Sequence, residues 1–237
     1  MSKKWLAMLI VVAVATGIIY YLYFTKPEAF LEKQQIIDEI NAFDHNVKIN
    51  TIEDRVQLDD YNYFVPFITD DGQPGVSYYR WARAKWQLIK FEKSETVVWQ
   101  LDDKDPSTKY IIWHYPKDTV DYMELYLMKN RSYMISDNEH HYEPKIQLVE
   151  KIEGTGNYGA LKVSEDFATV MQAVNLPIRN QIDLFGMFYS YETYNLGMNL
   201  FKDNEVIHLE SGSNGYWTGN VEAKFDFLLT VGESQLE

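Results

Sequence analysis

The first part of the chain carries one uninterrupted apolar run, whereas the remainder shows alternating patterns. From Trp5 to Phe24 the sequence WLAMLIVVAVATGIIYYLYF contains no charged residue. A helix of that length rises by about 30 Å, which matches the hydrocarbon core of a bilayer. The pattern therefore predicts a single transmembrane helix over residues 5–24, preceded by a short N-terminal segment of residues 1–4.

The residues at both ends of this run agree with a membrane span. Trp5 stands at one end and three tyrosines stand near the other, where amphipathic rings prefer the headgroup level. Lys3 and Lys4 precede the run, so the positive-inside rule predicts a cytoplasmic N-terminus and an extracellular C-terminal region. A cleaved signal peptide is the alternative, because Ala13-Val14-Ala15 resembles a cleavage site. We favour an uncleaved signal anchor, since the apolar run continues well past that point.

A helical period follows the span directly. Within residues 25–45, apolar side chains recur at helical spacing among acids and lysines, namely Phe30, Leu31, Ile36, Ile37, Ile40 and Phe43. We expect a juxtamembrane amphipathic helix that packs on the following domain, because so short a stripe makes a poor coiled coil.

Residues 46–237 mainly show the pattern of strands separated by turn signals. The stretch NVEAKFDFLLTV, residues 220–231, alternates apolar and polar positions, as expected for a strand with one buried face. One later segment, EDFATVMQAV, has helical spacing, with Ser164 as its N-cap and Pro177 just beyond its end. The sequence predicts a mainly β (α+β) extracytoplasmic domain, either an antiparallel sandwich or a strongly curved sheet with one or two helices.

Charge and composition narrow the classes of function. The chain has 35 acidic and 22 basic residues and a net charge of −13. Residues 1–26 contain three lysines and no acid, so the outer region is more acidic still. Such a surface disfavours nucleic acid, and no nucleotide or other cofactor is expected. The absence of cysteine excludes disulfides, thiol catalysis and metals held by cysteine.

The polar stretch SDNEHHYEP is a candidate metal site, because two histidines are flanked by carboxylates. In an extended chain His140 and His141 point to opposite faces. His141 with Glu139 or Glu143 is therefore the local ligand pair, whereas zinc takes three or four ligands. A further ligand such as His114 would have to come from elsewhere in the fold. The alternative, which we favour, is a polar hairpin loop between two strands.

Aromatic side chains are candidates for ligand binding, because rings on a solvent face stack on sugars and on apolar groups. Tyr216 and Trp217 lie in SGSNGYWTGN, which has the composition of a flexible loop, and Tyr79 and Trp81 lie in an aromatic segment. The alternative is that these rings belong to the core or to cross-strand pairs.

Motifs for catalysis are weak or missing. GTGNYG, residues 154–159, matches GxGxxG, but the extended chain after it favours a turn between two strands over a dinucleotide site. The chain has no GxSxG and no SxxK, so a nucleophilic hydrolase lacks its sequence motif.

The stretches VPFITDDGQPGVSYYRWARAKWQLIKF, DPSTKYIIWHYP and SDNEHHYEPKIQL make the outer region similar to uncharacterised single-pass membrane-anchored proteins of Gram-positive bacilli. The resemblance implies a cell-surface location and brings no functional motif. We expect a membrane-anchored extracytoplasmic binding or accessory module, with another envelope protein or a wall polymer as its partner. The alternative is an extracytoplasmic hydrolase that cuts envelope glycans with two facing carboxylates, one of which has a raised pKa.

Overall fold

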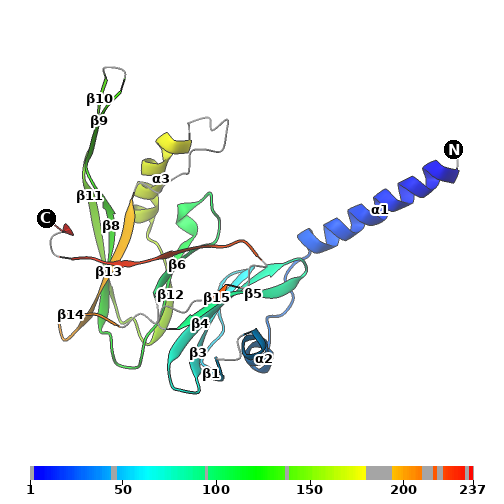
Figure 1. Ribbon diagram of the computed structural model, residues 1–237, viewed down its shortest axis with the longest axis horizontal. Coiled ribbons are helices and arrows are strands. Elements are labelled where there is room, and N and C mark those ends of the chain that lie inside the picture. Colours follow the sequence, from blue (N-terminus) through cyan, green and yellow to red (C-terminus); the bar gives the residue numbers. More distant parts are fainter. Residues whose placement is uncertain are drawn as a thin grey trace. The chain divides into compact units, whose positions relative to one another are not determined.

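Two compact units make up the chain in the computed structural model (Figure 1). Unit 1 comprises Met1–Lys93 and Gly212–Glu222, and unit 2 comprises Ser94–Ser211 and Ala223–Glu237. The β-rich region that the sequence predicts from residue 46 onward is thus shared between the two units. The structure describes residues 3–43, 47–93, 96–136, 139–179, 194–209, 216–217, 221–232 and 235–236.

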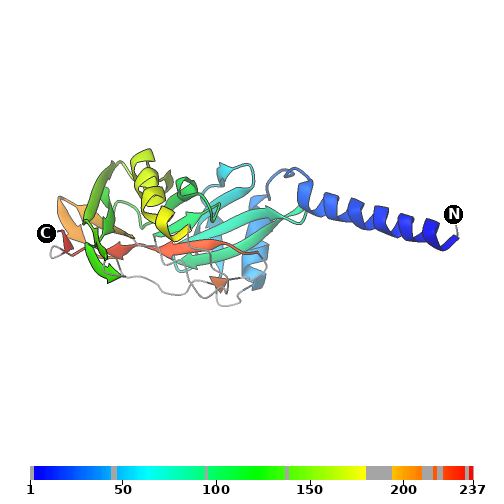
Figure 2. The ribbon, with the colours of Figure 1, turned by 90° about the horizontal axis from the view of Figure 1, so that it is seen from above.

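The apolar run forms one helix, α1 (Lys3–Phe24), which Figure 2 shows without interruption. Its segment Ala7–Phe24 is long and apolar enough to cross a membrane, and none of it is buried. Large apolar side chains along the helix, such as Val11, expose more than half of their surface. A bare apolar helix of this length matches the dimensions of a bilayer, as the sequence predicts.

Unit 1 is built on one antiparallel sheet. Its strands follow the order β1 (Ile49–Ile52), β3 (Asn62–Thr69), β4 (Pro74–Ala82), β5 (Lys85–Lys93) and β15 (Tyr216–Trp217), and β2 (Val56–Asp59) pairs with β3 as well. The three strands β3, β4 and β5 form a meander, because each is joined to the next by a short turn. Helix α2 (Lys33–Phe43) packs on this sheet by burying Ile36 and Ile40 in its core.

The juxtamembrane helix is shorter than the sequence predicts. Phe30 and Leu31 precede α2 and contact the same core from an extended segment. The Phe30 ring stacks on Tyr63 with 4.0 Å between ring centroids. A stripe of apolar residues therefore marks burial correctly here but overestimates the length of the helix.

A tight turn joins β4 to β5 without any residue that usually marks a turn. Arg83 and Ala84 have φ values of 55° and 57°, a backbone region that favours Gly or Asn. Ala82 pairs with Lys85, and Trp81 pairs with Trp86, so the two strands close directly on this turn.

Unit 2 contains two larger sheets, a hairpin and one α-helix. The first sheet has the order β12 (Tyr158–Lys162), β7 (Lys109–His114), β6 (Val97–Gln100) and β16 (Lys224–Phe227). The second has the order β11 (Ile146–Glu153), β8 (Tyr122–Lys129), β13 (Asn195–Lys202) and β14 (Glu205–Ile207), with β17 (Leu229–Thr230) parallel to β13. The hairpin joins β9 (Ser132–Ser136) to β10 (Glu139–Glu143); a short 3₁₀ helix covers Pro106–Thr108, and α3 covers Glu165–Arg179.

One core holds the two sheets of unit 2 together with α3. It includes Val98 and Ile111 from the first sheet, Leu125 and Leu196 from the second, and Met171 from the helix. Two sheets that share one hydrophobic core form a sandwich-like arrangement. The predicted mainly β (α+β) fold with antiparallel sheets and an N-terminal apolar helix is therefore confirmed.

Two local expectations differ from the structure. The long alternating stretch near the C-terminus is not one strand, because β16 pairs with β6 and β17 pairs with β13 in the other sheet. Helix α3 begins as predicted, with the Ser164 hydroxyl accepting from the Phe167 N–H at 3.4 Å, but it continues through Pro177 to Arg179. Pro177 therefore removes one backbone N–H donor from the last turn of this helix.

Candidate functional site

The rings that the sequence suggests for ligand binding do not come together on a surface. Tyr79 is fully buried, and its ring lies edge-on to Phe30 at 5.4 Å between centroids. Trp81 is 9% exposed and donates its indole N–H to the carbonyl oxygen of Thr25 at 3.2 Å. The structure corrects the expectation for both rings, because nearly all side chains of β4 are buried on both of its faces.

Tyr216 and Trp217 form a short strand where the composition indicates a flexible loop. As strand β15 they pair with Phe91 and Lys90 of β5 at the edge of the unit 1 sheet. Their side chains lie outside the described part of the chain, so their role in ligand binding remains a prediction.

The histidine-rich stretch also forms a strand, β10, rather than only a loop. His140 pairs with Ile135 and His141 with Met134 on β9, which places the two histidines on opposite faces as the sequence predicts. The His140 ring contacts the Tyr133 hydroxyl through Nδ1. The described residues include no cluster of three or more His, Asp or Glu side chains suited to a metal ion; the side chains of Glu139 and His141 lie outside that description.

Glu143, the third candidate metal ligand, forms an ion pair with a lysine of the protein. Its carboxylate lies 2.8 Å from Lys129 Nζ and accepts a hydrogen bond from the Ser132 hydroxyl at 2.8 Å. The bond from Lys129, with that from Ser132, lowers the pKa of Glu143 below its usual value. The fourth candidate, His114, is buried on β7 with its ring edge-on to Tyr158.

The GxGxxG stretch is a turn between strands, as the sequence predicts. Gly154 and Gly156 have φ values of 66° and 60° and connect β11 to β12, which belong to different sheets. Gly159 starts no helix but lies inside β12, where an added Cβ would come within 2.4 Å of the Trp113 ring. The third glycine therefore serves close packing rather than phosphate binding.

A pocket of about 790 Å³ opens in unit 2 at an interruption of strand pairing. Strands β8 and β11 pair up to Lys129 and Ile146, whereas β9 and β10 pair from Ser132 and Glu143 onward. Figure 1 shows β9 and β10 continuing from β8 and β11 as one long projecting hairpin. Pro144 lies at the joint and has no N–H to donate, so it cannot supply a donor to the ladder there.

Two cations line the pocket at this interruption. Arg131 follows β8, and Lys145 stands opposite it, just before β11. The remaining walls consist of amides and apolar side chains: Met128, Asn130, Tyr142, Asn195, Leu229 and Gln235. Among the residues that the structure describes, no Asp or Glu lines this pocket. Such a lining stands out in a chain whose acids outnumber its bases by 35 to 22.

Arg131 has no carboxylate partner among the described residues. Glu143 is already paired with Lys129, and Arg131 forms no ion pair or hydrogen bond with another described residue. Lys145 Nζ makes a long contact of 3.4 Å with the carbonyl oxygen of Gln235. An Arg and a Lys beside side-chain amides suit a carboxylate or phosphate, because all of these groups donate hydrogen bonds.

An exposed aromatic face continues from the pocket along the hairpin. Tyr142 lines the pocket with 67% of its surface exposed, and its cross-strand partner Tyr133 is 60% exposed. Ile135 and His140 extend the same face, because they alternate with these tyrosines along β9 and β10. Rings that remain this exposed offer a stacking surface for sugar rings or apolar groups.

The wall formed by Leu229 is held in place by β13. Gly197 permits the close approach, since an added Cβ would come within 2.4 Å of Val231. The Asn199 side chain bonds the Val231 backbone twice, donating to its carbonyl at 3.0 Å and accepting from its N–H at 3.1 Å. These contacts fix β17 beside β13 and thereby fix one side of the pocket.

Sequence reasoning missed Arg131 and Lys145, which lie on either side of the histidine-rich stretch, and Tyr142, which lies within it. A signal for them exists, because Lys129, Arg131 and Lys145 are basic residues close together in an acidic chain. Their convergence on one pocket requires the register of the two ladders, which the sequence pattern does not provide.

The chain matches no protein-family model, no curated protein and no solved structure. The geometry and the charges of the unit 2 pocket are therefore the basis for a functional assignment.

Proposed function

We propose that the protein is a single-pass membrane-anchored binding module that takes up an anionic ligand outside the cell. The observation that carries the proposal is the pocket of about 790 Å³ with two cations, three amides and, among its described lining, no carboxylate. Its volume lies within the range of small-molecule and ligand sites. An anionic wall polymer or an acidic segment of another envelope protein has the required chemistry.

The ligand would be held by charge in the pocket and by stacking beside it. The Arg131 guanidinium offers a planar pair of donors for a carboxylate or phosphate, and Lys145 adds a second positive charge. Tyr142 and Tyr133 offer their rings to the uncharged part of the ligand. A site with cations in the pocket and aromatic rings beside it suits a polymer with alternating anionic and apolar groups better than a bare inorganic ion.

The charges that flank α1 support the proposed orientation. Lys3 and Lys4 favour a cytoplasmic N-terminus, which puts both units on the outer side. Because the natural chain has no cysteine, single cysteines at Ser2 and Lys151 can be labelled without background. In intact cells, an impermeant maleimide should label the Lys151→Cys protein and leave the Ser2→Cys protein unlabelled; the opposite result would contradict this orientation.

Binding is favoured over glycan hydrolysis because the described carboxylates do not form a hydrolytic pair. Burial raises the pKa of Glu39, but this carboxyl group lies beside the buried Tyr79 of unit 1 and is not part of the unit 2 pocket. A glycosidase needs two carboxylates that face each other across the substrate. The described lining of the unit 2 pocket offers none.

Titration calorimetry of the full-length protein in detergent tests the binding proposal. Glycerol phosphate oligomers should bind, whereas dextran of similar length should not. Arg131→Ala and Lys145→Ala should each weaken binding about fivefold, since an exposed charge pair contributes about 1 kcal/mol. Lys151→Ala is the matched control, because Lys151 is an exposed cation on β11 that pairs with Glu153 at 2.9 Å. Equal losses for all three variants would contradict the proposal.

A further inference from the structure

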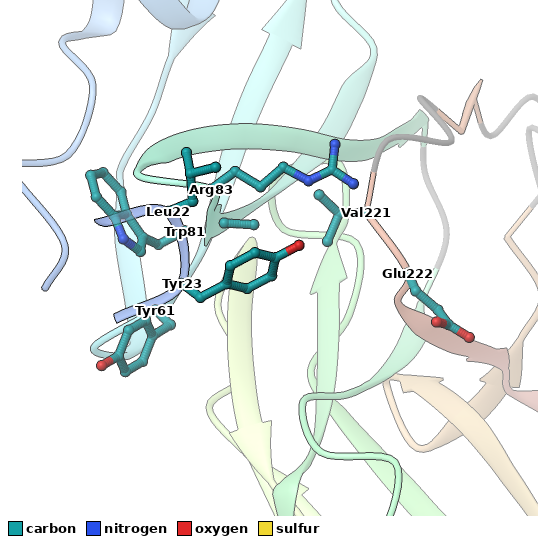
Figure 3. A pocket seen from close by; sticks show the side chains of 8 residues that line it. Leu22, Tyr23, Tyr61, Trp81, Arg83, Val221 and Glu222 are labelled. Atoms are coloured by element: carbon teal, nitrogen blue, oxygen red, sulfur yellow. The ribbon is translucent and has the colours of Figure 1, made fainter. Parts of the chain in front are cut away.

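A second pocket, of about 330 Å³, lies in unit 1 where α1 ends (Figure 3). Tyr23 comes from the last turn of α1, and Trp81 and Arg83 come from the β4–β5 hairpin. Tyr61 and Glu222 add further polar atoms to its rim. The pocket therefore combines a residue of the apolar helix itself with side chains of the folded unit.

Two tryptophans tie this hairpin to the first residues after α1. Trp81 donates its indole N–H to the Thr25 carbonyl at 3.2 Å, and Trp86 donates to the Glu28 carbonyl at 3.1 Å. Thr25 is the first residue beyond the helix. The headgroup layer on each side of a bilayer is about 5–8 Å thick, so a hairpin tied at this residue lies at headgroup level if α1 spans the membrane.

Arg83 is the cation of this pocket and has no partner among the described residues. It is exposed, and its φ of 55° is unusual for a residue with a side chain. A non-glycine residue in this backbone region persists only when its surroundings hold it there. The flanking pairs Ala82–Lys85 and Trp81–Trp86 impose the turn and leave the guanidinium at its tip.

The one carboxylate in the pocket does not neutralise Arg83. Figure 3 shows the Glu222 carboxylate directed away from the Arg83 guanidinium. The Glu222 backbone carbonyl is bonded instead by Arg80 at 3.0 Å. Figure 3 also shows the Tyr23 ring extending beneath the Arg83 side chain. A phosphate that enters here would find a guanidinium and a phenol hydroxyl as donors.

We propose that this pocket binds the phosphate of a phospholipid headgroup. The inference rests on the proposed membrane anchoring, because that anchoring brings lipid phosphates to the level of the hairpin tip. Lipid is the natural source of this anion, since Leu22 and Tyr23 of the span also line the pocket and would contact the acyl region. The overall acidic charge of the chain limits this contact to a local site instead of a broad basic surface.

Native mass spectrometry of the full-length protein in detergent tests this site by titration with phosphatidylglycerol. Arg83→Gly is the informative variant, because glycine adopts a positive φ freely, so the turn is retained while the guanidinium is lost. Its affinity for phosphatidylglycerol should fall about fivefold, the loss expected for one cation near a lipid surface. Lys85→Ala removes an exposed cation from the same hairpin outside the pocket and should change the affinity less than twofold.

Two further probes identify the source of the phosphate. Diacylglycerol, which lacks the phosphate, should bind equally weakly to the natural protein and to Arg83→Gly. A large excess of inorganic phosphate should not displace phosphatidylglycerol. Equal lipid affinity of Arg83→Gly and the natural protein, or displacement by inorganic phosphate, would overturn the proposal.

Alkaline carbonate extraction separates failure of this site from failure of the anchor. If carbonate leaves the chain in the membrane and Arg83→Gly binds lipid normally, the headgroup site alone is wrong. If carbonate releases the chain, the membrane anchoring is wrong, and the headgroup site is overturned with it. Arg131→Ala should leave lipid binding unchanged, which separates this site from the pocket in unit 2.

Discussion

Truncating Asn199 should loosen the wall of the unit 2 pocket at a measurable cost in stability. Asn199 is 5% exposed, and its side-chain amide makes two hydrogen bonds to the Val231 backbone. Asn199→Ala removes these bonds and leaves a buried N–H and a buried C=O without those partners, each of which costs about 1–3 kcal/mol. Because water can reach an edge strand, we take the lower part of that range and expect a loss of about 2–4 kcal/mol in the free energy of unfolding.

For a folded unit of this size, the loss corresponds to a decrease in Tm of about 6–15 °C. Thermal unfolding of the full-length protein in detergent, followed by circular dichroism, measures it. Thr230→Ala is the control, because Thr230 is exposed on the same strand and its side chain is not part of the Asn199 bonds. Glycerol phosphate affinity should also fall for Asn199→Ala, since Leu229 loses its fixed position. A Tm indistinguishable from that of Thr230→Ala would refute the role given to Asn199.

Three further predictions follow from the fold. Burial raises the pKa of Glu39, so the protonated form is favoured in the folded state, and stability is lost as pH rises from the unfolded pKa through the folded one. Glu39→Gln is similar in size and stays neutral, so it should raise the Tm at neutral pH and not at pH values below the unfolded pKa, as a pH series of melting curves would show. Gly159→Ala should destabilise unit 2 by about 1–3 kcal/mol because its Cβ meets the Trp113 ring, whereas Gly232→Ala, whose Cβ has no neighbour closer than 4.0 Å, should be nearly neutral in urea unfolding. Deleting α1 should transfer the protein from the membrane to the soluble fraction after cell lysis, and a deleted form that still sediments with membranes would argue against α1 as the anchor.

The sequence predicts helices and strands well where a hydrophobic pattern is compatible with only one type of secondary structure. The uncharged run forms one unburied helix, and the region from residue 46 onward is rich in strands, as the patterns predict. Partner choice is harder to predict, because alternation reports burial and not the identity of the neighbouring strand. The stretch that ends in Val231 shows this limit, since its two halves pair in different sheets.

Turns that depend on strand pairing are also beyond local sequence rules. The β4–β5 turn uses Arg83 and Ala84, neither of which is a usual turn residue. The meander imposes their conformation from both sides, so the local preference is overruled by tertiary structure. Unless this turn is known, the aromatic segment is taken for one continuous stretch. Tyr79 and Trp81 are then expected to be more exposed to ligand than they are.

The candidate site was only partly predictable for a related reason. The histidine-rich stretch is a candidate site in the sequence because its residue types bind metals. The charges of the pocket, however, come from the cations on either side of this stretch. Arg131 and Lys145 lie in different arms of the hairpin, and they line one pocket only because the ladder is interrupted between the two paired segments. The charge sign of a residue is visible in a sequence, but whether a carboxylate compensates that charge is a property of the fold.

Charge reversal at Arg131 tests the central claim most directly. Titration calorimetry of Arg131→Glu with glycerol phosphate oligomers should show a loss of more than about tenfold in affinity, because an attraction of about 1 kcal/mol becomes a repulsion of similar size. The loss should shrink as salt is added, since the groups are exposed and screened. An affinity equal to that of the natural protein at low salt would contradict the assignment of this pocket as an anion-binding site.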